Sequence, residues 1–125
     1  MWMKIGLLAI AGAVGTLARY WLNNFVYWLC GEGFPWWTLV VNVLGCFLFG
    51  LVWTLAEERA LISGETRLII LTGFMGAFTT FSTYAFETSD RIRLGLWLSA
   101  LGNFAAQNVL GIFGVFLGWA VGRLL

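Results

Sequence analysis

The sequence predicts an all-α membrane protein with four transmembrane helices. The chain has 125 residues, of which 61% are hydrophobic and 10% are charged, whereas soluble globular domains are nearer 25% charged. Its apolar residues fall into four runs, each close to the ~20 residues that a helix needs to cross a bilayer core. Almost nothing remains outside these runs and their turns, so we expect one four-helix transmembrane domain over residues 1–125, embedded in lipid, and no soluble domain.

The four predicted spans are joined by short connections. They cover about residues 5–28, 36–56, 68–88 and 94–121. The start of the chain has one feature of a signal peptide, an Ala-Ile-Ala sequence at residues 9–11, but the apolar stretch before it is too short and the run continues well beyond it. We therefore expect the first helix to be retained. The formal net charge of +1 provides no basic surface for nucleic acid.

Basic residues are almost evenly divided between the two sides of the predicted bundle. Four spans place both termini on one side, with Lys4, Arg59, Arg67 and Arg123. The other side holds Arg91 and Arg93, and also Arg19 if it reaches that interface. An excess of Lys and Arg in cytoplasmic loops sets the orientation of a membrane protein. Because this chain has so little excess, we expect it to insert in both orientations.

Neutral polar side chains recur along single faces of three spans. Helical spacing aligns Thr38 with Asn42 in the second span, and a four-residue step separates the members of the polar series in the fourth. Polar groups inside a bilayer must find a partner or face water. They either join helices by hydrogen bonds or line a polar path, and the pattern leaves both open. The fourth-span series is Ser99, Asn103 and Gln107, with Asn108 beside it.

Two sets of glycines predict different structures. Gly114, Gly118 and Gly122 repeat every four residues, a spacing typical of close helix packing in membranes. Gly73 and Gly76 instead precede a run of Thr and Ser and predict a local break in the third helix. A break at this depth is tolerated where it is buried in protein or lines a cavity, and its carbonyl groups are able to hold a cation.

The few remaining reactive or charged side chains argue against an enzyme and leave the role of the charged groups open. The chain has no histidine, so Cys46 has no base to activate it and we expect no enzymatic activity. Arg19 either extends to the membrane surface or attracts anions as a fixed charge within the bilayer. Glu87 is expected to end the third helix at an interface, which would leave no carboxylate near the middle of the membrane.

Three segments resemble the signatures of the Fluc (CrcB) fluoride channel family. They are GTLARY at 15–20, VNVLGCFLFG at 41–50 and GFMGAFTTFSTYAFET at 73–88, and the resemblance in length, spans and motif order covers the whole chain. It implies a passive, fluoride-selective channel that exports toxic fluoride across the bacterial inner membrane. It also implies an antiparallel, dual-topology homodimer with two pores, a broken third helix and a structural sodium ion at the centre.

The resemblance assigns roles to individual residues. It implies that backbone carbonyls of Gly76 and Thr79 hold the sodium ion and that Arg19 makes the vestibule positive. This chain departs from the pattern in having Tyr84 where the family usually has Phe, and Asn103 where some members have Tyr. Glu87 matches a glutamate at the end of the motif, without an assigned role. The implied pore residues are Asn42, Thr80, Phe81, Ser82, Thr83, Tyr84 and Asn103.

These residue types suit a small, strongly hydrated anion. Hydroxyl and amide donors can replace lost water, and the positive edges of aromatic rings attract an anion weakly, so that narrowness and donor density select against chloride. The alternative is a small, dual-topology, proton-coupled exporter. That class needs an acid in the first helix, where this chain has only Arg19. A scaffolding subunit, a third possibility, would leave the polar faces without a role.

Overall fold

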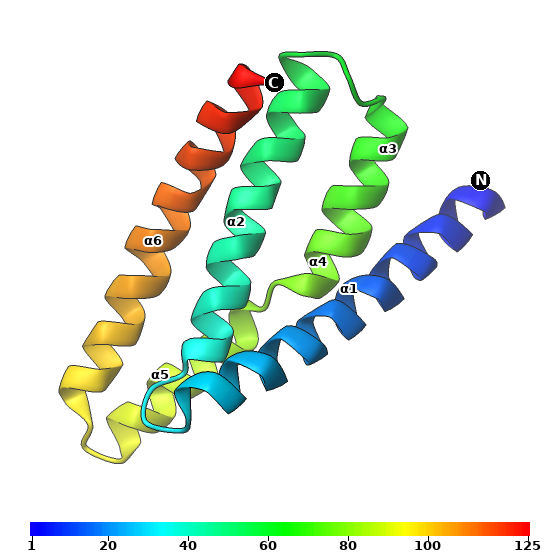
Figure 1. The fold of residues 1–125 in the computed structure, drawn as a ribbon. Coiled ribbons are helices and arrows are strands. Elements are labelled where there is room, and N and C mark those ends of the chain that lie inside the picture. The colour runs from blue at the N-terminus through cyan, green and yellow to red at the C-terminus, as the bar shows by residue number, and fades with distance from the viewer.

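The computed structural model describes all residues 1–125 and consists of helices and their connections. Four rods are long and apolar enough to cross a membrane, which confirms the predicted four-span, all-α fold. The first, second and fourth are single helices, and the third is built from several pieces (Figure 1). The elements are α1 (Trp2–Cys30), α2 (Trp36–Glu57), α3 (Gly64–Leu68), the π-helical stretch η1 (Ile69–Met75), α4 (Gly76–Phe78), α5 (Phe81–Arg93) and α6 (Trp97–Leu124).

The connections alternate between the two ends of the bundle. Both termini and the α2–α3 connection lie towards one end, and the α1–α2 and α5–α6 connections lie at the other (Figure 1). The two connections at that second end contain Gly31 and Gly95, whose φ angles are 72° and 76°. Glycine adopts such positive φ values without strain, so it allows the chain to reverse within a few residues.

The third span is interrupted, as predicted. Thr79 and Thr80 adopt extended conformations, with φ/ψ of −86°/157° and −147°/115°. The π-helical stretch η1 leads into the short α4 just before this break, and π-helical turns are frequent at functional sites. The interruption turns one apolar span into two helical pieces, which places the beginning of α5 inside the bundle.

Glycines allow α2 and α6 to lie against each other along much of their length. An added Cβ at Gly114 would come within 3.1 Å of the Val43 carbonyl oxygen, and one at Gly122 within 2.8 Å of Thr54 Cβ. An added Cβ at Gly118 would meet the backbone of Phe47 and Leu51. The predicted glycine packing seam is therefore confirmed, and α2 is the helix on its other side.

The first half of the third span packs between α1 and α2. Gly15 of α1 leaves no room for a side chain beside Phe74, and Gly73 lies against Ala11. The buried apolar core is small and sits in this region. Its members are Val41, Leu71, Met75 and Phe78.

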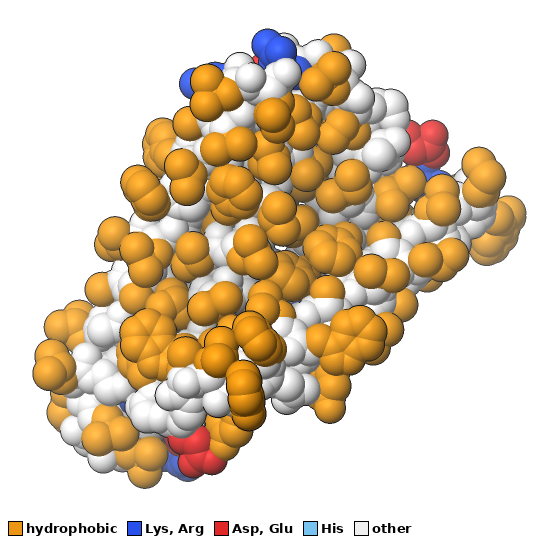
Figure 2. Space-filling model, in the orientation of Figure 1, with side chains coloured by type: hydrophobic (Ala, Val, Ile, Leu, Met, Phe, Trp, Pro, Cys, Tyr) orange, Lys and Arg blue, Asp and Glu red, His pale blue; other side chains and the backbone are white.

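The outer surface is dominated by hydrophobic side chains, and charged side chains gather near the two ends (Figure 2). Only 21 of the 125 residues are buried within the chain. Because water disfavours large continuous apolar surfaces, this distribution indicates that lipid or another protein surface surrounds the helices.

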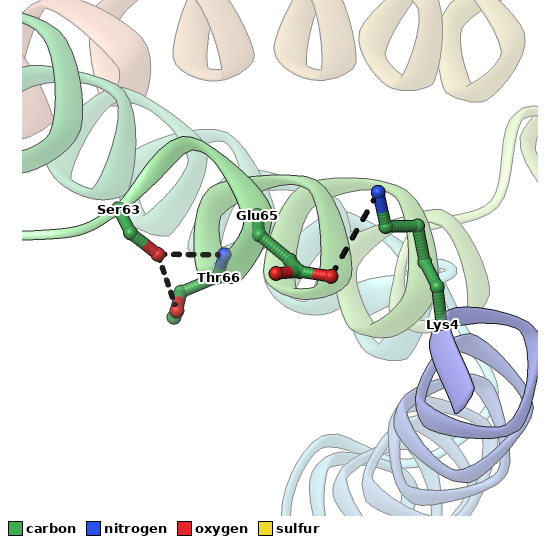
Figure 3. Close-up of polar contacts among 4 residues, drawn as sticks. All are labelled: Lys4, Ser63, Glu65 and Thr66. Atoms are coloured by element: carbon green, nitrogen blue, oxygen red, sulfur yellow. Dashed lines mark hydrogen bonds and ion pairs between the residues drawn. The ribbon is translucent and has the colours of Figure 1, made fainter. Parts of the chain in front are cut away.

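Ion pairs join the helices at the end that carries the termini. Lys4 of α1 lies 3.7 Å from Glu65 of α3, and Ser63 begins α3 by accepting a hydrogen bond from the Thr66 N–H (Figure 3). Arg123 donates two hydrogen bonds to Glu58, and this guanidinium holds the pKa of the Glu58 carboxyl below its usual range. Exposed pairs of this kind stabilise a fold only slightly.

Candidate functional site

A hollow of about 320 Å³ opens between α2, the break in the third span and α6. None of the lining residues is charged, so the hollow combines apolar side chains with a few polar groups and carries no fixed charge. Four of the residues implied as pore-lining contribute to it: Asn42, Thr80, Phe81 and Tyr84. The other lining residues are Gly45, Cys46, Phe49, Thr79, Gln107, Asn108 and Val115.

Asn42 joins α2 to the break by two hydrogen bonds with the backbone of one residue. Its Oδ1 accepts from the Thr80 N–H at 2.8 Å, and its Nδ2 donates to the Thr80 carbonyl at 3.0 Å. Backbone N–H only donates and a carbonyl only accepts, so this pairing fixes which end of the Asn42 amide is oxygen and which is nitrogen. Asn42 therefore stabilises the break and has a defined hydrogen-bond direction.

The orientation of the Asn42 amide also determines the orientation of the Gln107 amide on α6. The Asn42 Nδ2 also donates to Gln107 Oε1 at 3.1 Å, so the Gln107 amide has its oxygen towards Asn42 and its nitrogen on the other side. That nitrogen, Nε2, is buried and has no acceptor. A buried donor without a partner is costly. The series of hydrogen bonds from Thr80 through Asn42 to Gln107 thus ends in an N–H donor that needs an acceptor.

The break also frees carbonyl groups. In a continuous helix, the N–H groups of Thr80 and Thr83 would bond to the carbonyls of Gly76 and Thr79. Here the Thr80 N–H bonds to Asn42 and the Thr83 N–H bonds to Thr80 Oγ1 at 3.3 Å. The carbonyls of Gly76 and Thr79 lose these helical donors. Neutral carbonyl oxygens suit a hard cation, so the residues present fit the implied sodium ion.

Two aromatic rings stand next to each other at the beginning of α5. The centroids of Phe81 and Tyr84 are 5.6 Å apart, with an interplanar angle of 68°, so one ring presents its edge to the other. Ring edges carry partial positive charge. Phe81 is 77% exposed in the single chain, which means that the protomer itself covers only one side of this ring.

The hydroxyl groups of the motif mainly shape the beginning of α5. Thr80 Oγ1 accepts from the Thr83 N–H and donates to Thr83 Oγ1 at 3.0 Å, which is the usual arrangement of a helix N-cap. Ser82 is exposed and lies outside the hollow, with its Oγ 3.5 Å from that of Thr80. The capped helix directs the positive end of its dipole towards the hollow, which favours an anion there.

Two further implied residues lie away from the hollow. Asn103 is fully buried on α6, where its Nδ2 donates to Thr88 Oγ1 at 2.9 Å. Its Oδ1 is buried without a donor. Arg19 is half-buried on α1, one turn beyond Gly15, and its side chain forms no hydrogen bond or ion pair. The structure therefore does not bring either residue together with Asn42, Phe81 and Tyr84.

The expectation that Glu87 ends the third helix is wrong. The helix continues to Arg93, and Glu87 is only 9% exposed. Its Oε1 accepts from Thr38 Oγ1 at 2.7 Å and from Trp37 Nε1 at 3.0 Å. The donors come from the beginning of α2, a contact between distant segments that local sequence does not reveal. The protein thus contains a carboxylate buried against α2, which the sequence did not predict.

The chain is similar to known proteins over nearly its whole length. Residues 6–119 match the family described as CrcB-like protein, Camphor Resistance (CrcB). The chain belongs to the CrcB family. This membership confirms the resemblance found in the three sequence motifs.

The similarity to individual CrcB relatives is high and extends over full chains. A protein of Nitrosococcus oceani is 58% identical over 125 residues, 100% of both chains. Proteins of Solidesulfovibrio magneticus and Desulforapulum autotrophicum are 54% and 48% identical over 98% of each chain. All three relatives are named fluoride-specific ion channel FluC. Together with the four spans, these bacterial relatives support the expected multi-pass location in the inner membrane.

The geometry adds two residues that the family resemblance did not assign to the pore. Gln107 and Asn108 both line the hollow. Gln107 was visible as a member of the four-residue polar series on α6, and Asn108 as its neighbour. Their importance depends on hydrogen bonds between separate helices, so the series alone gave their face of the helix but not their function.

Proposed function

We propose that this protein is a fluoride-selective passive ion channel, not an enzyme, that exports fluoride across the inner membrane. The observation that carries the proposal is the uncharged hollow lined by Asn42 and Gln107, where the hydrogen bonds from Thr80 through Asn42 leave the buried Gln107 amide nitrogen without an acceptor. An acceptor without hydrogens, such as a halide ion, satisfies that donor. The relatives named fluoride-specific ion channel FluC support fluoride as the halide.

Fluoride suits this site because it is small and strongly hydrated. The Gln107 amide, the dipole of α5 and the edges of Phe81 and Tyr84 together replace part of the water that the ion loses. None of these groups carries a full charge. An ion is therefore attracted enough to enter and held weakly enough to leave, as conduction requires.

A second copy of the chain, inserted in the opposite direction, completes the proposed pore. The hollow is open, and the 77% exposure of Phe81 leaves one side of its ring uncovered. Two antiparallel copies would enclose two such hollows, and the near-balance of basic residues permits this dual topology. Fluoride would then pass through two pores in each homodimer.

The freed carbonyls of Gly76 and Thr79 provide the proposed structural sodium site. Each copy offers two carbonyl oxygens, so two copies meeting at the break would offer four to one hard cation. When bound, the ion supplies positive charge and holds the two broken helices together. Arg19, which has no partner within the chain, is proposed to raise the positive potential of the vestibule further.

The buried Glu87 carboxylate, although it lies in the third span and not in the first helix, favours a second candidate function, a small proton-coupled exporter of dual topology. Such exporters need an acid that binds a proton within the membrane, and Glu87 is buried with one oxygen, Oε2, lacking a donor. The two candidates differ in coupling. A channel moves fluoride down its electrochemical gradient without protons, whereas an exporter stops when the proton gradient is removed.

Purified protein in liposomes distinguishes these functions. We expect fluoride loaded inside to leave when valinomycin and potassium provide a counter-current, with the same initial rate with and without a proton ionophore. Failure of fluoride to leave under any of these conditions would contradict the proposed channel. A rate that depends on a pH gradient would favour the exporter.

A further inference from the structure

The Tyr84 side chain adds a hydroxyl group to the aromatic lining of the hollow. Tyr84 and Asn108 of α6 both line the hollow, and the Tyr84 hydroxyl lies beside the Asn108 amide. Its only hydrogen-bond partner is the Asn108 Nδ2, at 3.3 Å. This contact determines what else the hydroxyl is able to bind.

The orientation of the Asn108 amide is fixed by a neighbouring backbone group. Its Nδ2 lies 2.8 Å from the Phe104 carbonyl oxygen. A carbonyl only accepts, so the atom beside it must be the amide nitrogen, and an interchange of nitrogen and oxygen is excluded. The same nitrogen faces the Tyr84 oxygen. Because an amide nitrogen only donates, the hydroxyl of Tyr84 must be the acceptor in this pair.

The Tyr84 hydroxyl therefore keeps its own hydrogen for another partner. A hydroxyl that accepts a hydrogen bond also becomes a stronger donor, because hydrogen bonds in a chain polarise one another. Two of the residues that line the hollow thus carry donors without acceptors: Gln107, through its buried Nε2, and Tyr84, through its hydroxyl. They come from different helices, α6 and α5, and line the same cavity.

We infer that the Tyr84 hydroxyl, oriented by Asn108, is an additional hydrogen-bond donor to the permeating anion and helps to set its affinity and selectivity. This inference rests on the proposed channel function. Tyr84 is the residue that contacts the ion, and Asn108 is a positioning residue. A phenylalanine at the same place would keep the ring edge and lose the donor.

Fluoride flux measured over a range of fluoride concentrations tests this inference. Tyr84→Phe removes the hydroxyl while keeping the ring, and Asn108→Leu removes the group that orients it. We expect each substitution to raise the half-saturating fluoride concentration about two- to tenfold. The double variant should behave like Tyr84→Phe alone, because Asn108 acts through Tyr84. Asn24→Leu, at an exposed position outside the hollow, is the matched control.

The possible outcomes separate this inference from the proposed function. If the unchanged protein conducts fluoride and Tyr84→Phe has the same half-saturation, the inference is wrong and the channel function stands. Additive effects of the two substitutions would show that Asn108 does not act through the hydroxyl. If the unchanged protein conducts no fluoride, the function itself fails. Should Asn108→Leu not fold, the ¹⁹F chemical shift of bound fluoride in Tyr84→Phe, compared with the unchanged protein in detergent, decides the same question.

Discussion

Asn42 holds both backbone groups of Thr80, accepting from its N–H at 2.8 Å and donating to its carbonyl at 3.0 Å. One side chain of α2 thereby supports the break in the third span and sets the direction of the hydrogen bonds that follow. The remaining Asn42 contact leads to Gln107, whose nitrogen is left without an acceptor. The break and the donor in the hollow are thus two consequences of the same pairing.

Asn42→Asp tests whether the direction of the hydrogen bonds from Asn42 to Gln107 matters for conduction. The carboxylate can still accept from the Thr80 N–H, but it cannot donate to Gln107, and it brings negative charge into an anion path. The Gln107 amide would turn to donate to Asp and would present its oxygen to the hollow. We expect fluoride flux to fall about 100-fold or more, since an unpaired buried charge costs several kcal/mol. Liposome efflux measures the effect.

Asn24→Asp is the control for the added charge. Asn24 is exposed on α1 and does not line the hollow. The fluoride flux of the Asn24→Asp variant should therefore remain within a factor of about two of that of the unchanged protein. Equal losses in the two variants would mean that the charge acts at long range and that the Asn42 contacts are unimportant.

Gln107→Glu changes the last residue in the series of hydrogen bonds from Thr80 through Asn42, with little change in side-chain shape. Glutamate keeps an oxygen for Asn42 but replaces the free donor with a second oxygen. We expect loss of fluoride conduction while the protein still purifies as folded material, which size-exclusion chromatography can establish alongside the flux assay. Normal flux in a folded Glu variant would remove Gln107 from the path.

Phe81→Ile tests the contribution of the ring edge. Isoleucine retains apolar volume but has no positive edge, so we expect flux to fall about tenfold, at the upper end of what an aromatic interaction contributes. Phe86→Ile is the control, because Phe86 is also exposed, at 70%, and does not line the hollow. If both variants lose the same activity, the effect reflects assembly and not the ring.

Gly118→Ala tests the seam between α2 and α6. The added methyl group would come within 2.7 Å of the Leu51 backbone nitrogen and would also meet the Phe47 carbonyl. We expect it to lower stability by about 1–3 kcal/mol, the usual cost of overpacking. Thermal unfolding followed by size-exclusion chromatography measures this. Gly6→Ala, where an added Cβ has nothing within 4 Å, should unfold at or above the original temperature.

Much of this architecture could be predicted from the sequence because it depends on local patterns. The apolar runs gave the four spans, the spacing of Gly114, Gly118 and Gly122 gave a packing face, and the Gly and Thr run gave the break. Each follows from a physical constraint of the bilayer that acts on a short segment. Family resemblance added the correct family but did not describe the hydrogen bonds between the helices of this chain.

The parts that local patterns could not predict depend on contacts between separate helices. Glu87 was expected to end the third helix, yet it lies within α5, where Thr38 and Trp37 of α2 donate hydrogen bonds to its carboxylate. The free donor of Gln107 similarly depends on how Asn42 pairs with Thr80. Hydrogen-bond direction is a property of the whole chain of partners, so the sequence of α6 alone does not contain it.

The native Cys30 allows the proposed dual topology to be tested. Its thiol is exposed at the end of α1, whereas Cys46 is half-buried in the hollow. In a Cys46→Ser background, a membrane-impermeant maleimide added to intact spheroplasts should label about half of the Cys30 thiols if both orientations occur equally. Permeabilised spheroplasts should be labelled completely. Labelling near zero or near completion before permeabilisation would contradict antiparallel insertion.

The central claim is that uncharged donors in the hollow select fluoride over other halides. Its most direct test is the reversal potential of the purified protein in a planar bilayer, with fluoride and chloride gradients set in opposite directions. We predict that the current reverses at the equilibrium potential of fluoride and does not change when the chloride gradient is altered. A reversal potential that follows chloride equally, or that follows the proton gradient, would contradict the account.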